Sequence, residues 1–240
     1  MSHHIGIGCA SAIALYLLTG PASAQALTVM PVTVQLQPGQ LAATLSISGQ
    51  NDGRETPYQV RAFAWSQDGN SERLEPTDDL ILSPPLGAIR SNATQIVRIV
   101  VRHPPQNREA VYRILLDQIP PPSAPGTIRM ALRLSLPVFV EPATRIAPHL
   151  EWRIEHDADG VWLVAVNDGS RHERLHNILL SAGTATFKPE GDSSPYLLAG
   201  VTRRFRLPDD AVPANTAELR LTAQSDSGKI DVLVRSPQKS

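Results

Sequence analysis

The 240-residue sequence is poor in cysteine, lysine and aromatic residues. Its one cysteine, Cys9, lies in an apolar N-terminal stretch, so the chain beyond that stretch has no disulfide and no thiolate nucleophile or ligand. Aromatic residues make up 5% of the chain. A carbohydrate-binding surface needs exposed aromatic rings, and this composition supplies few of them. Stability must therefore come from packed apolar cores.

Lysine occurs only at Lys188, Lys229 and Lys239, so arginine supplies most of the positive charge. The formal net charge is −1, and the sequence has no run of basic residues. This balance argues against nucleic acid as a partner. Arginine binds carboxylates through two parallel hydrogen bonds, so this composition suits carboxylate recognition better than a lysine-rich surface would.

Residues 1–24 have the pattern of a secretory signal peptide. They contain no Asp, Glu, Lys or Arg, and an apolar run, Ala10–Leu18, precedes the small-residue site Ala22–Ala24. This pattern predicts export with cleavage before Gln25. An uncleaved membrane anchor is the less favoured alternative, because the apolar run is too short to span a bilayer comfortably.

The rest of the chain reads as short strands separated by turns, with no long segment of helical period. Such spacing is typical of antiparallel β-sandwiches. In the first half the alternating runs are Thr28–Leu36, Ala43–Ser48, Gln59–Trp65, Gln95–Val101, Val111–Asp117 and Ile128–Phe139. In the second half they are Glu151–Ile154, Val161–Val166, His176–Ser181, Thr202–Leu207, Ala217–Ala223 and Lys229–Arg235.

Two domains are expected from this pattern and from the length of the chain. We predict an N-terminal sandwich over residues 25–142, a linker over 143–148 and a C-terminal sandwich over 149–240. Pro142 and Pro148 make the connection stiff. Two sandwiches joined by a short elbow would leave a cleft between them, and such clefts are common binding sites.

The segment Ile128–Phe139 is the most informative part of the sequence. Apolar residues occupy every second position from Ile128 to Val138, and Arg129, Arg133 and Ser135 lie on the opposite face. A row of this length suits a strand that offers its edge to another chain. On this segment alone, an ordinary core strand explains the pattern at least as well.

Several stretches resemble one known family. They are Val60–Gly69 with its Trp-Ser-Gln-Asp-Gly sequence, Leu82–Pro85 followed by Ile96–Ile99, Tyr112–Pro120, and Ile128–Pro142. Together they resemble the periplasmic pilus-assembly chaperones of the chaperone–usher pathway, most closely the archaic branch. The resemblance covers residues 27 to about 147, whereas the second half matches in length and strand content only.

This resemblance implies an all-β fold of two Ig-like sandwiches in an L-shaped arrangement. It implies a periplasmic chaperone, not an enzyme, that needs no cofactor or metal. The expected partners are pilin or fimbrial subunits, which receive a donated strand, and an outer-membrane usher. The donor row would be Ile128, Met130, Leu132 and Leu134. A subunit-free chain would shield this apolar edge by pairing it with a second copy or covering it with its own loop.

The sequence also departs from the commonest branch of that family. The positions that would hold the subunit's terminal carboxylate are Thr33 and Pro137, and the basic residue usual before Pro142 is Glu141. We therefore name Arg98 and Arg113 as candidate carboxylate anchors, with ordinary surface ion pairs as the alternative for each. The resemblance further implies a cis peptide bond before Pro84.

Other motifs point elsewhere only weakly. His172 and His176 have a metal-like spacing, but we interpret them as a solvated loop. Asp157–Gly160 is interpreted as a hairpin turn and Trp65 as a sandwich core anchor. The alternatives to a chaperone are a two-domain Ig-like adhesin or carbohydrate-binding module, and a secreted hydrolase. The latter would need a carboxylate pair or metal triad, which the sequence does not reveal.

Overall fold

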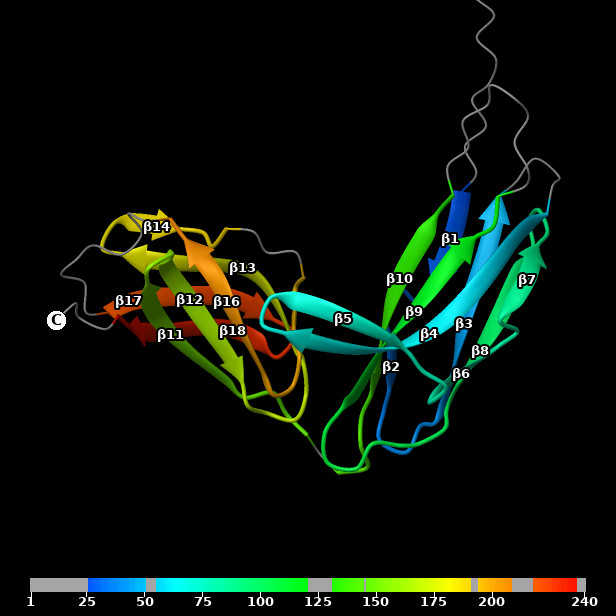
Figure 1. Ribbon diagram of the computed structural model, residues 1–240, viewed down its shortest axis with the longest axis horizontal. Coiled ribbons are helices and arrows are strands. Elements are labelled where there is room, and N and C mark those ends of the chain that lie inside the picture. Colours follow the sequence, from blue (N-terminus) through cyan, green and yellow to red (C-terminus); the bar gives the residue numbers. More distant parts are fainter. Residues whose placement is uncertain are drawn as a thin grey trace, which may run out of the picture.

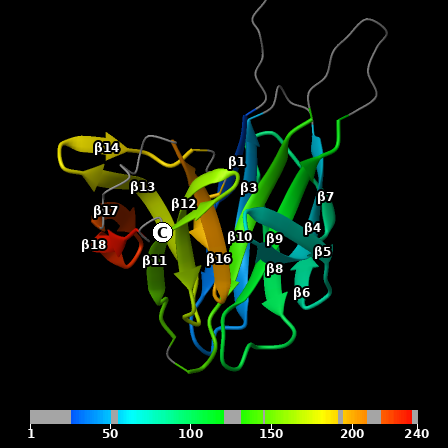
Figure 2. The ribbon, with the colours of Figure 1, turned by 60° about the vertical axis from the view of Figure 1, so that its left-hand side comes forward.

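The computed structural model describes residues 26–50, 55–120, 131–144, 146–190, 194–208 and 218–236. These residues form eighteen strands in two β-sandwiches, with β1 to β10 in the first and β11 to β18 in the second (Figures 1 and 2). The predicted all-β fold of two Ig-like sandwiches is confirmed. No helix in this described part of the chain is long and apolar enough to cross a membrane. The predicted signal peptide lies outside the described residues.

The first sandwich packs two sheets against each other. One sheet has the order β1 (Ala26–Met30), β3 (Ala42–Gln50), β8 (Thr94–Val101), β6 (Leu80–Ser83). The other has the order β2 (Val34–Leu36), β10 (Arg133–Val140), β9 (Ala110–Gln118), β4 (Thr56–Asp68), β5 (Ser71–Pro76), with β7 (Leu86–Ile89) on β4.

Alternation along each strand divides core from surface in this sandwich. On β9, Tyr112, Ile114 and Leu116 are buried in the core, whereas Arg113 and Asp117 lie on the outer face of the sheet. The same alternation on β10 turns its even-numbered residues inward. The outer face of this sheet carries the contacts with the second sandwich that are described below.

The second sandwich is smaller. One sheet has the order β11 (Leu150–Asp157), β12 (Gly160–Asn167), β16 (Val201–Leu207). The other has the order β14 (Ala185–Phe187), β13 (Glu173–Ala182), β17 (Glu218–Ser225), β18 (Gly228–Arg235), with β15 (Tyr196–Leu197) on β13. A separate apolar cluster that includes Leu163, Leu180, Phe205 and Leu221 forms its core.

The predicted single strand Thr28–Leu36 is wrong, because the chain changes sheets at Pro31. The Met30–Pro31 peptide bond is cis, and the segment divides into β1, which pairs with β3, and β2, which pairs with β10. Proline lacks the N–H that a continuous ladder requires. The Ser83–Pro84 bond is also cis, which confirms the expectation from the family resemblance.

The predicted hairpin turn at Asp157–Gly160 is confirmed between β11 and β12. The Oδ1 atom of Asp157 accepts hydrogen bonds from the backbone N–H groups of Asp159 (2.9 Å) and Gly160 (3.1 Å). Hydrogen bonds from Arg204 and Trp162 lower the pKa of the Asp157 carboxyl to about 2. The carboxylate is therefore used to close the turn and to bind the neighbouring strand β16.

The linker after β10 is held against the second sandwich by the loop that follows β12. The Ser170 N–H donates to Ala147 O (3.0 Å), and the Asp168 N–H donates to His149 O (3.2 Å). Gly169 lies directly beneath this crossing. A Cβ atom at that position would lie 2.4 Å from His149 N, so only glycine allows the two backbones to approach this closely.

A fully buried asparagine at the end of β12 organises the same region. Asn167 Nδ2 donates to Arg171 O (2.8 Å) and Leu197 O (3.1 Å). Its Oδ1 accepts from the backbone N–H groups of His149 and Gly169, each at 3.2 Å. One side chain thus binds the linker, the loop and the strand β15, and it fixes where the second sandwich begins.

Replacing this side chain should destabilise the protein. Asn167→Ala removes four hydrogen bonds and leaves buried backbone groups without partners, which we expect to lower the free energy of unfolding by about 3 kcal/mol. Urea denaturation of the full chain measures the change. Asn107→Ala, at an exposed loop position, is the matched control and should change little. Equal unfolding midpoints for Asn167→Ala and the parent chain would contradict the assignment.

Candidate functional site

Strand β10 is fully paired on one side and only partly paired on the other. It forms an antiparallel ladder with β9 over its whole length, from Arg133 to Val140. On its other side the parallel partner β2 pairs only with the last three residues, Val138–Val140. Among the described residues, the segment Arg133–Pro137 therefore has an unpaired backbone edge, which we call the free edge (Figure 1).

The backbone groups of the free edge can be assigned from the ladder geometry. Gln118 N–H donates to Leu132 O on the β9 side, and Glu141 N–H donates to Leu36 O on the β2 side. Because groups alternate along a strand, odd-numbered residues of β10 direct their N–H and C=O away from β9. Arg133 and Ser135 thus present N–H donors to the free edge, and Pro137 occupies the odd position that has none.

The even-numbered side chains of β10 form an apolar row that runs from the core towards solvent. Leu136 is 5% exposed, Leu134 is partly buried against the core, and Leu132 just before the strand is 40% exposed. Of the predicted donor residues, Leu134 therefore lies within the free edge and Leu132 lies just before it, and their donor role stays a prediction. The other two predicted donor residues, Ile128 and Met130, lie outside the described residues.

An ion cluster holds the start of β10 on the outer face of the sheet. Asp117 on β9 accepts a hydrogen bond from Arg61 Nη2 (2.7 Å), and it also pairs with Arg133 on β10. Burial raises the pKa of the Asp117 carboxyl, but hydrogen bonds from the two arginines outweigh it and leave the pKa below its ordinary value. These ion pairs hold Arg133, the first residue of the free edge, against strand β9.

The outer face of β10 packs on the second sandwich at its other end. Trp65, Phe139, Tyr196 and Leu198 form a buried group, which we call the interface cluster. The rings of Trp65 and Tyr196 meet edge to face at 5.5 Å. Trp65 was predicted to anchor the core of a sandwich; it is buried, but between the two sandwiches, because its side chain lies on the outer face of β4.

His172 is part of this interface, so its prediction as a solvated loop residue is wrong. Its ring stacks on the ring of Phe139, with 3.6 Å between the ring centres and 10° between the ring planes. Both its backbone N–H (3.0 Å) and its Nδ1 (2.7 Å) contact Oε2 of Glu109, which precedes β9. The side chain of His172 is 6% exposed and that of Glu109 is 0% exposed. His176 takes no part in this contact, so the two histidines form no metal pair.

The end of β4 and the turn that leads to β5 add polar contacts to the interface (Figure 1). Gln67 donates from Nε2 to Tyr196 O (2.9 Å) and accepts from Leu198 N–H (3.0 Å) through Oε1. Asn70 Oδ1 accepts from Arg204 N–H (3.1 Å). The two amide side chains thus bind backbone groups of the second sandwich, much as a neighbouring strand would, and they fix its orientation relative to β4.

Glu141, which departs from the family pattern, also serves the domain contact. Its carboxylate accepts a hydrogen bond from Gln35 Nε2 on β2 (2.8 Å) and lies 3.4 Å from Arg171 Nη2 of the second sandwich. The side chain is largely buried. An acidic residue at this position therefore connects β2, the end of β10 and the loop after β12.

Arg113 lies at the rim of the interface cluster. Its guanidinium carbon is 3.8 Å from the ring centre of Trp65 and 5.8 Å from that of Tyr196, and its Nη2 lies 3.5 Å from Glu72. The side chain is only 12% exposed, and its buried Nε has no hydrogen-bond partner in the described structure. Burial lowers the pKa of Arg113, an effect that the carboxylate of Glu72 opposes only in part.

The other predicted anchor, Arg98, is not brought to this place. It lies on β8, in the opposite sheet of the first sandwich, between the buried residues Val97 and Ile99. Its side chain is exposed on the outer face of that sheet. Of the two candidates, only Arg113 lies on the same sheet as β10. The sequence could not separate them, because alternation marks a side chain as outward without showing which of the two sheets carries it.

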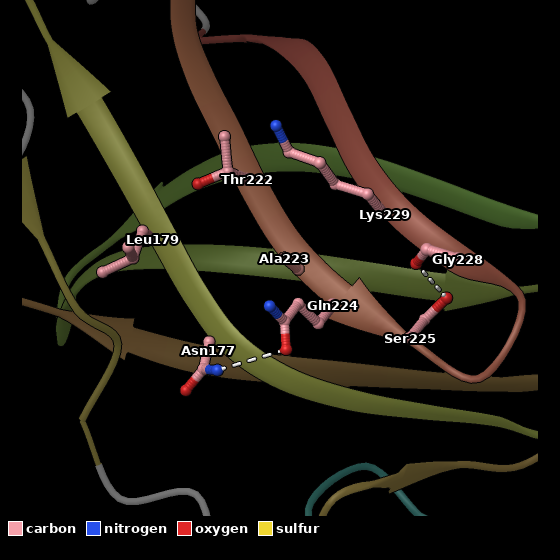
Figure 3. Close-up of a pocket in the computed structure, with 8 residues that line it drawn as sticks. All are labelled: Asn177, Leu179, Thr222, Ala223, Gln224, Ser225, Gly228 and Lys229. Carbon is pink, nitrogen blue, oxygen red and sulfur yellow. Dashed lines mark hydrogen bonds between the residues drawn. The ribbon is translucent and has the colours of Figure 1, made fainter.

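Two further features lie on the second sandwich. The exposed side chains of His149, Glu151 and Asp168 have ligand atoms within 4.8 Å of one another, and the hydrogen bond to Asp168 raises the pKa of His149. A hollow of about 460 Å³ lies over β13, β17 and β18 (Figure 3). Its amides Asn177 and Gln224 contact each other at 3.5 Å. Neither feature adjoins the free edge of β10.

Comparison with known proteins agrees with this geometry. The sequence profile of the pili and flagellar-assembly chaperones, PapD N-terminal domain, matches residues 26–145. A search of curated protein sequences gave no match.

Solved structures with the same fold include chaperones from several bacteria. The chaperone–tip adhesion subunit complex CsuC–CsuE of Acinetobacter baumannii, from archaic chaperone–usher Csu pili, matches with 19% identity and a TM-score of 0.66, over 89% of this chain and 100% of that one. The SafA pilin–SafB chaperone complex of Salmonella enterica matches with 16% identity and a TM-score of 0.62, over 87% of this chain and 96% of that one. The E. coli chaperone DraB matches with 19% identity and a TM-score of 0.59, over 86% of this chain and 98% of that one.

These structural likenesses show the fold, and the sequence profile spans half of the chain, including every strand that borders the free edge. The chain therefore belongs to the family of pili and flagellar-assembly chaperones that carry a PapD N-terminal domain.

Proposed function

We propose that this chain is a periplasmic chaperone that captures pilin or fimbrial subunits by lending them strand β10. The observation that carries the proposal is the free edge: β10 is anchored on one side by β9 and at its end by β2, and its first five residues have no second partner among the described strands. A rigid strand with an open edge is what an incomplete sandwich needs in order to be completed by a strand from another chain.

Two kinds of contact would hold the subunit. The N–H groups of Arg133 and Ser135 would pair with a strand of the subunit and continue its sheet. Leu132 and Leu134 would fill its open core, with Ile128 and Met130 continuing the row by sequence. Burying one leucine side chain contributes about 1.5–3 kcal/mol, so a row of this kind supplies affinity, and the backbone pairing fixes the register.

Arg113 is the proposed anchor for the subunit's terminal carboxylate. A half-satisfied guanidinium beside two aromatic rings, on the sheet that carries the free edge, favours a carboxylate as its ligand. Arg98 is too far around the sandwich to share this role, since it belongs to the opposite sheet.

Two partners complete the proposal. The loaded chaperone would deliver its subunit to an outer-membrane usher.

Without a subunit, the apolar edge would pair with that of a second copy or be covered by the chain's own loop, because exposed strand edges aggregate unless they are shielded. Subunit and second copy would compete for one edge, so adding subunit should convert dimers into one-to-one complexes. Sedimentation that finds only monomer without subunit would exclude self-pairing.

A charge at the free edge should abolish capture without unfolding the chaperone. Leu132→Asp places a carboxylate where the subunit core would enclose it, and burying an unpaired charge costs several kcal/mol. The matched control is Leu233→Asp, because Leu233 is 66% exposed on β18 of the second sandwich. Co-purification of the pilin-like subunit from periplasm measures capture, and circular dichroism measures folding. Normal yield with a folded Leu132→Asp chain would contradict the donor assignment.

Loss of the proposed anchor should weaken subunit binding. Arg113→Ala removes a charge-assisted hydrogen bond worth roughly 1.5–3 kcal/mol, which corresponds to at least a tenfold rise in the dissociation constant. Arg98→Ala is the control, and as an exposed residue on the other sheet it should change affinity by less than about twofold. Titration calorimetry with the co-purifying subunit measures both variants. Equal and small effects would mean that the subunit is held by backbone and apolar contacts alone.

A further inference from the structure

One carboxylate connects the start of β10 to the two strands beside it. Asp117 on β9 is directly opposite Arg133 of β10 in one ladder and opposite Gln59 of β4 in the other. Its carboxylate accepts a hydrogen bond from Arg61 Nη2 on β4 at 2.7 Å, and its second oxygen pairs with Arg133 Nε. The side chain of Asp117 is only 15% exposed. A largely enclosed acid thus links three neighbouring strands on the outer face of the sheet.

This end of β10 has little other support. The ladder with β9 runs back from Val140 to Arg133, and beyond it Gln118 N–H donates to Leu132 O. The parallel partner β2 pairs only from Val138 onward. Apolar packing also fades in this direction, since Leu132 is 40% exposed. Strand ends with few buried contacts open readily. The pair of Asp117 with Arg133 therefore lies where the donor strand is most prone to fray.

The same pair distinguishes the native register of β10 from its neighbours. A shift of two residues is the smallest that keeps the apolar side chains of the strand facing inward. Such a shift would place Arg133 opposite Leu115 or Ile119. Asp117 would then lie opposite Ser135 or the alanine two residues before Arg133. Neither alternative joins the acid to the base, so the enclosed carboxylate would lose one of its two cations.

We propose that Asp117 is a positioning residue for strand donation, which keeps the first residues of β10 extended and in register before a subunit arrives. The inference rests on the proposed function and adds a residue that prepares the donor strand. Asp117 lies on the outer face of the sheet, whereas the apolar row turns the other way. It therefore acts through Arg133 and does not enter the core of the subunit.

An ordered donor strand lowers the cost of capture. A flexible segment must lose conformational freedom when it pairs, and only the fraction of chains with an extended strand can bind. In the complex the same residues would be paired on both sides, so the subunit itself would hold them in place. Loss of Asp117 should therefore slow association much more than it speeds dissociation.

The first measurement is amide hydrogen exchange in the free monomer of Asp117→Asn. Asparagine keeps the shape of the side chain but removes the charge with which both arginines pair. We expect the protection of the Gln118 and Leu134 amides to fall about fivefold, while the protection of Ile114 in the middle of β9 is unchanged. Asp117→Glu keeps the charge and should recover part of the protection. Circular dichroism and thermal unfolding check that each variant is folded.

A matched control comes from the second sandwich. Asp231 on β18 is also held by two cations, with Arg220 Nε at 2.7 Å and Lys229 Nζ at 3.5 Å. Asp231→Asn therefore makes the same chemical change at a comparable site that is not on the donor sheet. It should leave the exchange of β9 and β10 unaltered.

The second measurement is the rate of capture. The probe is the pilin-like protein that co-purifies from periplasm with the parent chain, unfolded in urea and diluted into each chaperone variant. We expect Asp117→Asn to associate about fivefold more slowly than the parent and to dissociate within about twofold of the parent rate. Arg133→Ala removes the same pair from β10 and leaves Asp117 bonded to Arg61, so it should slow association as well. Asp231→Asn should match the parent.

Unchanged protection of Gln118 and Leu134 in Asp117→Asn would overturn the positioning role, and so would a normal association rate despite lost protection. Faster dissociation with normal association would place the effect of the acid in the complex, and that too would overturn the role. In each of these cases the parent chain still captures the subunit, and the proposed function stands. Failure of the parent chain to capture any subunit would instead overturn the proposed function, together with the role that rests on it.

Discussion

The half-paired state of β10 is the constraint on which the rest of the structure depends. A strand that serves as a donor must be rigid, yet it must keep one edge open. The chain satisfies both needs by pairing β10 with β9 throughout and with β2 only over Val138–Val140. The chain leaves β1 in one sheet and enters β2 in the other, and β2 has only three residues. Pro137 lies at the boundary, at the position whose N–H would face the opening.

The opposite face of the same strand connects the free edge to the second sandwich. Leu134 and Leu136 turn inward, but Phe139 turns outward and stacks on His172, which contacts Glu109 in a fully buried arrangement. A buried acid with one unpartnered oxygen is costly when isolated, so its histidine partner gives the interface a single preferred geometry. One strand thus carries the proposed donor residue Leu134 and the domain contact made by Phe139, and its neighbour β9 carries Arg113 beside the aromatic rings.

Alternating apolar residues predicted most strands, and the family resemblance predicted the cis bond at Pro84. The donor row that the resemblance implies stays a prediction. The domain contacts escaped prediction, because residues as distant as Gln67 and Tyr196 meet only in the folded chain. The sequence did contain a sign of these contacts. Trp65 and Phe139 are large aromatic residues at strand positions that point away from the core of the first sandwich, where polar residues facing solvent would be expected. Such residues indicate a second contact surface. Outward position alone could not separate Arg98 from Arg113, since each sheet has an outer face.

Residue-resolved amide hydrogen exchange on β10 tests the central claim most directly. In monomeric, subunit-free protein, the amides of Leu134 and Leu136 should exchange slowly because they face β9, whereas those of Arg133 and Ser135 should exchange rapidly from the open edge. Capture of a subunit should slow Arg133 and Ser135 strongly and leave the even-numbered amides unchanged. Slow exchange of Arg133 and Ser135 in the free monomer, unaltered by the subunit, would mean that β10 is an ordinary internal strand and would contradict the account.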